Sequence, residues 1–323
     1  MLAVAACGEG DGSTGDAGEP AQPYIVATTG IWADVASMVA CDGALDVRTL
    51  VPAGGDPHAY EPSLRDREML DAAVLVVSNG LGLEALLDDT IDDVAAGGVP
   101  VFAVAEHVDT IPIGEHGGVD DEGDYGHDED EHADGADDGH VEDEHGDGGD
   151  DPHVWFDPTR VADALPALGA AIVAAGGDPD ATGDCVSSAG AELEALDADV
   201  EAQLAAVAPE RRLLVTNHDS LGYFADRYGF EVLGTILPSA STLTAANPAQ
   251  LEALGEDIEA AGVPAIFTES LSDDTDAAAL ADRLDVEIVE LYTDALGDAD
   301  SPAATYADLL RADADLIAAA LAE

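Results

Sequence analysis

Short apolar runs alternate with longer amphipathic segments along most of the chain, and this alternation outlines the fold. Short runs rich in valine and isoleucine predict strands, and segments whose apolar residues recur every three or four positions predict helices. In the first half, the pattern predicts strands at 24–29, 45–51, 73–77 and 99–104, with helices at 31–39, 64–71 and 81–94. Regular strand–helix alternation of this kind indicates a doubly wound, mostly parallel sheet.

The second half repeats the pattern after a helical interval. Strands are predicted at 213–216, 231–236, 265–268 and 287–291, with helices at 221–228, 248–261, 274–284 and 301–322. The interval contains helical segments at 159–175 and 184–208, and the latter has apolar residues at spacings of three and four: Leu193, Leu196, Val200, Leu204 and Val207. We therefore predict an α/β protein with two doubly wound lobes, 24–183 and 209–323, and a bridging helix over 184–208.

Residues 107–150 interrupt the pattern inside the first lobe. This segment is almost entirely acidic residues, glycine and histidine, and Tyr125 is its only aromatic residue. It cannot bury enough apolar surface to fold alone, so we expect a disordered loop. Its histidines and carboxylates suit zinc, which favours an auxiliary metal-gathering loop over a solvated spacer. The histidines of this loop are His107, His116, His127, His132, His140 and His145.

The first residues predict an anchor and a tether. Val4-Ala5-Ala6-Cys7 resembles the lipobox of bacterial lipoproteins, and the Gly-, Asp- and Ser-rich stretch that follows reads as a disordered tether within 1–23. A charged n-region is missing and the apolar stretch is short for a signal peptide, so an incidental cysteine is the alternative. We expect lipidation at Cys7, with the protein outside the cytoplasm at the cell surface or in the periplasm.

The charge of the chain narrows the range of partners. Its 70 acidic residues face only 9 basic ones, all arginine, for a net charge of −61. Such a chain repels phosphate, which excludes nucleic acid as a partner and disfavours anionic membrane surfaces. Membrane contact is therefore expected only through the lipid anchor. We interpret the acid spread through the helices as a solvated surface suited to a salty medium.

Three further histidines lie on predicted loops at strand ends in both halves: His58, His153 and His218. Each alone fits an ordinary surface histidine, but together they fit a metal site, because ligands of parallel sheets bind beyond the carboxyl ends of the strands. Proline directly precedes His58 and His153 and stiffens the backbone there. Imidazole suits zinc, which takes four ligands. Asp294 or Glu269, both placed after strands of the second half, could supply the fourth.

With these residues the chain resembles the metal-binding subunits of bacterial ABC importers for zinc and manganese. The resemblance runs from about residue 24 to the C-terminus and rests on four ordered motifs: Asp-Pro-His-Ala-Tyr-Glu-Pro at 56–62, Asp-Pro-His-Val-Trp at 151–155, His-Asp-Ser-Leu-Gly-Tyr-Phe at 218–224 and Thr-Asp-Ala-Leu at 293–296. It implies two lobes joined by a rigid helix and one metal in the cleft between them. The implied ligands are His58 and His153 from the first lobe, and His218 and Asp294 from the second.

The resemblance also bears on the metal and on the partner. Manganese-preferring members tend to have glutamate where this chain has His218, and a His-rich acidic loop resembles the zinc members. Three imidazoles and one carboxylate likewise favour Zn²⁺ over the harder Mn²⁺. The implied partner is the membrane permease of an ABC importer, and we expect a monomer.

Two other functions compete with this interpretation. A zinc hydrolase would need an open ligand position and a general base, for which Glu269 is the obvious candidate; four protein ligands would leave no such position, so we expect no enzyme. A surface adhesin or metal buffer that used the acidic loop alone would have many weak sites and no tight one.

Cys41 and Cys185 remain after the anchor cysteine is set aside. Outside the cytosol such a pair often forms a disulfide, which here would tie the first helix to the start of the bridging helix. The alternative is two buried free thiols, because sequence alone does not fix the distance between them.

Overall fold

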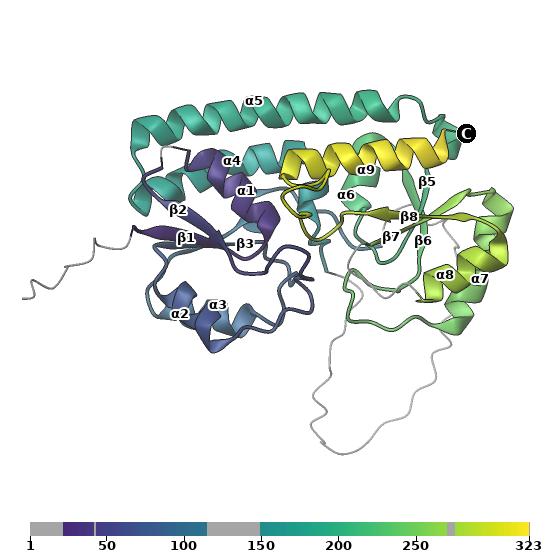
Figure 1. Cartoon of the computed structure of the whole chain (residues 1–323), viewed down its shortest axis with the longest axis horizontal. Coiled ribbons are helices and arrows are strands. Elements are labelled where there is room, and N and C mark those ends of the chain that lie inside the picture. The colour runs from purple at the N-terminus through teal and green to yellow at the C-terminus, as the bar shows by residue number, and fades with distance from the viewer. Residues whose placement is uncertain (1–21, 42, 115–148, 270–274, 323) are drawn as a thin grey trace, which may run out of the picture.

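The computed structural model describes residues 22–41, 43–114, 149–269 and 275–322, and it arranges them in two α/β lobes (Figure 1). Each lobe contains a four-stranded parallel sheet, in the orders β2-β1-β3-β4 and β6-β5-β7-β8. The first sheet contains β1 (Tyr24–Ala27), β2 (Asp46–Thr49), β3 (Leu75–Ser78) and β4 (Val101–Ala103). The second contains β5 (Leu213–Thr216), β6 (Glu231–Thr235), β7 (Ala265–Glu269) and β8 (Glu287–Leu291). The predicted fold class is confirmed.

Alternation of side chains along the central strands explains why helices cover both faces of the first sheet. Ile25 of β1 packs in the same core as helix α1 (Gly30–Val39), whereas Val26 points to the opposite face. That opposite face is covered by α2 (Leu64–Asp71) and α3 (Asp88–Ala96). A strand buried on both faces must be apolar throughout, as the run 75–77 is.

The second sheet is covered in the same way. Helices α6 (Gly222–Tyr228) and α9 (Tyr306–Leu321) share a core with Leu214, and α7 (Pro248–Ala261) and α8 (Thr275–Leu284) share one with Val215. Leu214 and Val215 are consecutive on β5, so their side chains point to opposite faces of the sheet.

One helix runs along both lobes. After α4 (Pro158–Ala174), helix α5 (Pro179–Leu204) extends over 26 residues, or roughly 39 Å at 1.5 Å per residue. Figure 1 shows it stretched beside α4 at one end and α9 at the other. Its buried Leu193, Leu196, Val200 and Leu204 belong to the same apolar cluster as residues of both sheets. The lobes therefore share one core along this helix.

Three predicted helix starts differ from the structure by five residues or more, each for a local reason, and the bridging helix ends at Leu204 instead of 208. The helix predicted at 81–94 begins only at Asp88, because Gly80, Leu81 and Gly82 all have positive φ and form a turn. The bridging helix begins at Pro179, before residue 184, because Asp178 caps its first turn and proline fits there. The last helix begins at Tyr306 rather than at 301 and is capped by the Thr305 side chain.

The ends of the acidic loop lie side by side. Ile113 N donates to Gly149 O at 3.0 Å and Asp151 N donates to Ile111 O at 2.8 Å, so the chain leaves and re-enters the lobe at one place. His107 does not belong to the loop as predicted: it ends the short 3-10 helix Val104–His107, and its ring stacks on Phe102 with centroids 4.3 Å apart. The remaining loop histidines and Cys7 lie outside the described residues.

Within the described ranges, none of the helices combines the length and apolar character needed to cross a membrane.

A disulfide joins Cys41, just beyond α1, to Cys185 on α5, with Cα atoms 6.1 Å apart. It closes a loop with a sequence separation of 144 residues, and cross-links over long loops remove conformational entropy from the unfolded chain.

We expect the double variant Cys41→Ser/Cys185→Ser to lose about 2–5 kcal/mol of unfolding free energy. Urea unfolding of the variant and of wild type, each with and without reductant, measures the loss. Reductant should lower the midpoint for wild type only. Equal midpoints for the oxidised wild type and the variant would show that the disulfide does not constrain the unfolded chain.

Candidate metal centre

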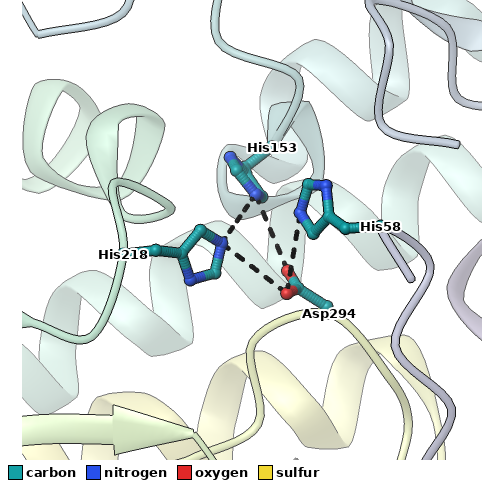
Figure 2. Close-up of side chains that lie close together, drawn as sticks. All are labelled: His58, His153, His218 and Asp294. Atoms are coloured by element: carbon teal, nitrogen blue, oxygen red, sulfur yellow. Dashed lines mark hydrogen bonds and ion pairs between the residues drawn. The ribbon is translucent and has the colours of Figure 1, made fainter. Parts of the chain in front are cut away.

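Four side chains converge between the lobes: His58, His153, His218 and Asp294 (Figure 2). Each offers one nitrogen or oxygen atom, and these atoms all lie within 4.8 Å of one another. All four residues are at most 3% exposed. His58 follows β2, His218 follows β5 and Asp294 follows β8, so these three lie beyond the carboxyl ends of strands. The turn that carries His153 meets the end of β3, because the Asn79 side chain, directly after that strand, donates to Pro152 O at 2.9 Å.

Matching Asp-Pro-His turns hold the two histidines of the first lobe. The Asp56 carboxylate accepts from the His58 backbone N–H at 2.8 Å, and the Asp151 carboxylate accepts from the His153 backbone N–H at 2.9 Å. The same Asp151 oxygen lies 2.7 Å from His153 Nδ1, which leaves Nε2 facing the centre. The sequence indicated the stiffening by proline but not this second role of the aspartates.

Glu269 orients His218 rather than joining the four. Its Oε1 contacts His218 Nδ1, so His218 presents Nε2 to the other side chains. The strand pairing explains this contact: Thr216 of β5 lies opposite Phe267 of β7, and His218 and Glu269 each follow two residues later. Strands β5 and β7 are far apart in sequence, so the contact between Glu269 and His218 can be expected only once the strand order is known.

The separations around the centre suit a tetrahedral ion. His153 Nε2 and His218 Nε2 are 3.1 Å apart, and the Asp294 oxygens lie 3.6 Å from His218 Nε2, 3.7 Å from His153 Nε2 and 3.9 Å from His58 Nε2. Four ligands at zinc–nitrogen distances of 2.0–2.1 Å would be spaced by about 3.3 Å. The donor set therefore fits a divalent cation with small adjustments.

Several of these ligand atoms make no hydrogen bond with the described part of the protein. His58 Nε2 and both Asp294 oxygens are buried, and none has a hydrogen-bond partner among the described residues. Leaving a buried polar atom unsatisfied costs about 1–3 kcal/mol, and more for a charged one. A cation bound by these atoms would remove that cost.

Burial and mutual contact separate the pKa values of the cluster. Burial, aided by the charges of His153 and His218, lowers the pKa of His58 to about 3, and burial also holds the pKa of His153 well below its usual value. Burial raises the pKa of Asp294 well above its usual value, although His218 opposes the shift. For His218, burial lowers the pKa, but the Asp294 and Glu269 carboxylates outweigh it and raise the pKa to about 9.

In the metal-free protein at neutral pH, two of the imidazoles are therefore neutral and His218 carries a proton beside the carboxylates. Metal ligation requires a neutral imidazole, so that proton must leave when an ion binds.

Hydrogen bonds across the lobes keep the ligand loops together near His153. Trp155 Nε1 donates to Thr293 O at 3.0 Å, beside Asp294, and the Tyr306 hydroxyl donates to Trp155 O at 2.6 Å. The Tyr223 hydroxyl donates to Asp151 O at 2.8 Å. The sequence alone did not indicate a role for these aromatic residues in the site, although Trp155 and Tyr223 lie within the motifs that carry the resemblance.

A cavity of about 530 Å³ lies between the lobes and reaches one member of the cluster, His58. His58 and Pro152 line it from the first lobe, and Asp219 and the segment 238–241 line it from the second. An ion could approach the cluster from this cavity past His58, and Asp294 lines a second cavity of about 350 Å³.

Comparisons with known proteins agree with this architecture. The family model described as zinc-uptake complex component A, periplasmic, matches residues 25–320. The zinc-binding protein TroA of Treponema pallidum is 32% identical, over 95% of this chain and 91% of TroA. The manganese-binding lipoprotein MntA of Halalkalibacterium halodurans is 26% identical, over 100% of this chain and 95% of MntA. The solved structure of the Treponema pallidum periplasmic zinc-binding protein TroA superposes with a TM-score of 0.76 at 29% identity, over 94% of this chain and all of that one.

A family model that spans both lobes, relatives over nearly the full length and a shared fold lead to one conclusion, which confirms the resemblance. The chain belongs to the zinc-uptake complex component A family of metal-binding receptors of ABC importers.

Proposed function

We propose that this chain is a zinc receptor that binds one Zn²⁺ through His58, His153, His218 and Asp294 and delivers it to the permease of an ABC importer. The observation that carries the proposal is the convergence of these four buried side chains between the lobes, with ligand atoms left unsatisfied by the protein. A buried set of three imidazoles and one carboxylate has few other uses.

The choice of zinc rests on the donor atoms. Imidazole nitrogen suits Zn²⁺, whereas Mn²⁺ is harder and prefers oxygen donors in octahedral surroundings. The relatives carry both zinc and manganese in their names, so similarity alone does not select the ion. His218 supports zinc, since a glutamate there would add a second oxygen ligand. A manganese receptor with the same four residues is the alternative.

The geometry supports binding rather than catalysis. Four protein ligands fill a tetrahedral zinc ion and leave no position for an activated water. Glu269, the candidate base of a hydrolase, contacts His218 on the side away from the centre. A carboxylate held there orients a ligand and does not face a bound substrate.

The setting of the proposed function is outside the cytoplasm. The family is periplasmic by description, and relatives such as MntA are lipoproteins by name. For this chain we propose a lipid anchor at Cys7, a monomeric receptor at the end of a tether, and transfer of the ion to a membrane permease. His116, His127, His132, His140 and His145 would gather zinc near the cavity.

Replacing any of the four ligands should abolish tight binding. We expect His58→Ala, His153→Ala, His218→Ala and Asp294→Ala each to weaken zinc binding by more than about 100-fold, since loss of outer-shell partners alone costs 10–100-fold. Competition with a zinc chelator measures the affinity. His107→Ala, which removes a histidine that stacks on Phe102 away from the cluster, is the matched control. Tight binding retained in two of the four variants would refute the assignment.

Exchanging one imidazole for a carboxylate should move the preference toward manganese. Glu269 would repel a carboxylate at position 218, so we combine His218→Glu with Glu269→Gln and use Glu269→Gln alone as the control. The ratio of zinc to manganese affinity should fall at least about tenfold in the double variant, because carboxylate oxygen is the harder donor. Competition between the two ions provides the measurement, and an unchanged ratio would argue against His218 as a ligand.

Zinc binding should release a proton at pH values well above the usual histidine range. Since the pKa of His218 is about 9 in the metal-free site, about one proton should leave it on binding at pH 7–8, and more where Asp294 is also protonated. The apparent affinity should then rise about tenfold per pH unit up to about pH 9. Calorimetry in buffers of different ionisation enthalpy counts the protons. Affinity independent of pH above 7 would contradict a charged His218.

A further inference from the structure

A segment of the second lobe meets the His58 turn without contributing a ligand. The Thr242 hydroxyl donates to Asp56 Oδ2 at 2.7 Å, across 186 residues of sequence. The other oxygen of the same carboxylate, Oδ1, accepts from the His58 backbone N–H at 2.8 Å. Asp56 is therefore shared between a ligand turn of the first lobe and a side chain of the second.

The segment that carries Thr242 is fixed to the loop of another ligand. It follows β6, and its backbone bonds to the His218 loop three times: Ile236 N donates to Thr216 O at 3.0 Å, Leu237 N to Asn217 O at 2.7 Å, and Asp219 N to Ser239 O at 3.0 Å. Thr242 therefore moves with His218, and Asp56 moves with His58. Their hydrogen bond joins one ligand loop of each lobe by a path that does not pass through the ion.

The position of this bond matters for the release of metal. Ser239, Ala240 and Ser241, which directly precede Thr242, line the 530 Å³ cavity that reaches His58. The interlobe bonds of Trp155, Tyr306 and Tyr223 lie around His153, whereas the Thr242–Asp56 bond lies beside His58 at the cavity. Parting of the lobes at the cavity must break it.

We propose that Thr242 is a positioning residue whose hydrogen bond to Asp56 holds the lobes closed over the bound ion and thereby slows its release. This inference rests on the proposed function, because it assumes a divalent metal at the four buried side chains. Thr242 touches none of the four, so it should change how long the ion stays without changing what surrounds it.

The test variant is Thr242→Val, which keeps the branched shape and removes the hydroxyl. Thr242→Ser restores the hydroxyl and should behave as wild type. Thr244→Val is the matched control, because the Thr244 hydroxyl donates to Ser241 O within the same segment and does not cross to the first lobe.

Stopped-flow release of zinc to an excess of chelator should be roughly 10- to 100-fold faster for Thr242→Val, the factor expected for loss of one hydrogen bond to a carboxylate. The Thr242→Ser and Thr244→Val proteins should release zinc at the wild-type rate. The absorption spectrum of bound Co²⁺ should be the same for all four proteins.

Two results would overturn the latch while leaving the proposed function intact: an unchanged release rate in Thr242→Val, or an altered Co²⁺ spectrum, which would mean that Thr242 shapes the ligand set. A wild-type protein without a tight divalent site would overturn the proposed function itself, and the latch with it.

Discussion

The burial of an acidic side chain among three imidazoles is the constraint on which the arrangement of this protein depends. Asp294 and the histidines are removed from water between two lobes, where an unpaired charge is costly. Asp151 and Glu269 offset part of that cost, because their carboxylates contact Nδ1 of His153 and His218. The atoms that face the centre, among them His58 Nε2 and the Asp294 oxygens, are left for an ion. A site of this kind is stable when filled, which is a suitable property for a protein that must hold a scarce metal.

The carboxylates of Asp151 and Glu269 also determine which ring nitrogen of His153 and His218 faces the bound ion. Because each fixes one ring nitrogen of a histidine, each ring can present only Nε2 to the ion. Asp56 shares the backbone contact of Asp151, but its second oxygen accepts from Thr242. Three acidic residues thus position three histidines by different means. This division of tasks accounts for a few of the acidic residues, while most of those in the described ranges are exposed or half-buried.

Local patterns in the sequence were sufficient to predict the α/β lobes and the three histidines of the centre, whereas the choice of Asp294 over Glu269 came from the family resemblance. A strand buried on both faces, such as 75–77, is apolar along its whole length, and each Asp-Pro-His motif is contiguous, so both can be recognised in the sequence alone. The role of Glu269 depends on the pairing of β5 with β7, and that of Thr242 on packing between lobes, so no local pattern indicates them. The early start assigned to α3 failed because Leu81 adopts a left-handed conformation that its type disfavours.

The apolar cluster along α5 has a consequence for how the protein gains stability from its cargo. Since residues of both sheets belong to one cluster, the two halves should unfold in a single cooperative transition rather than as separate domains. A ligand that binds only the native state adds to its unfolding free energy by mass action. Metal bound by a few loops would therefore protect the whole molecule, distant helices included, against heat and proteolysis. The metal-free receptor would unfold and be degraded more readily.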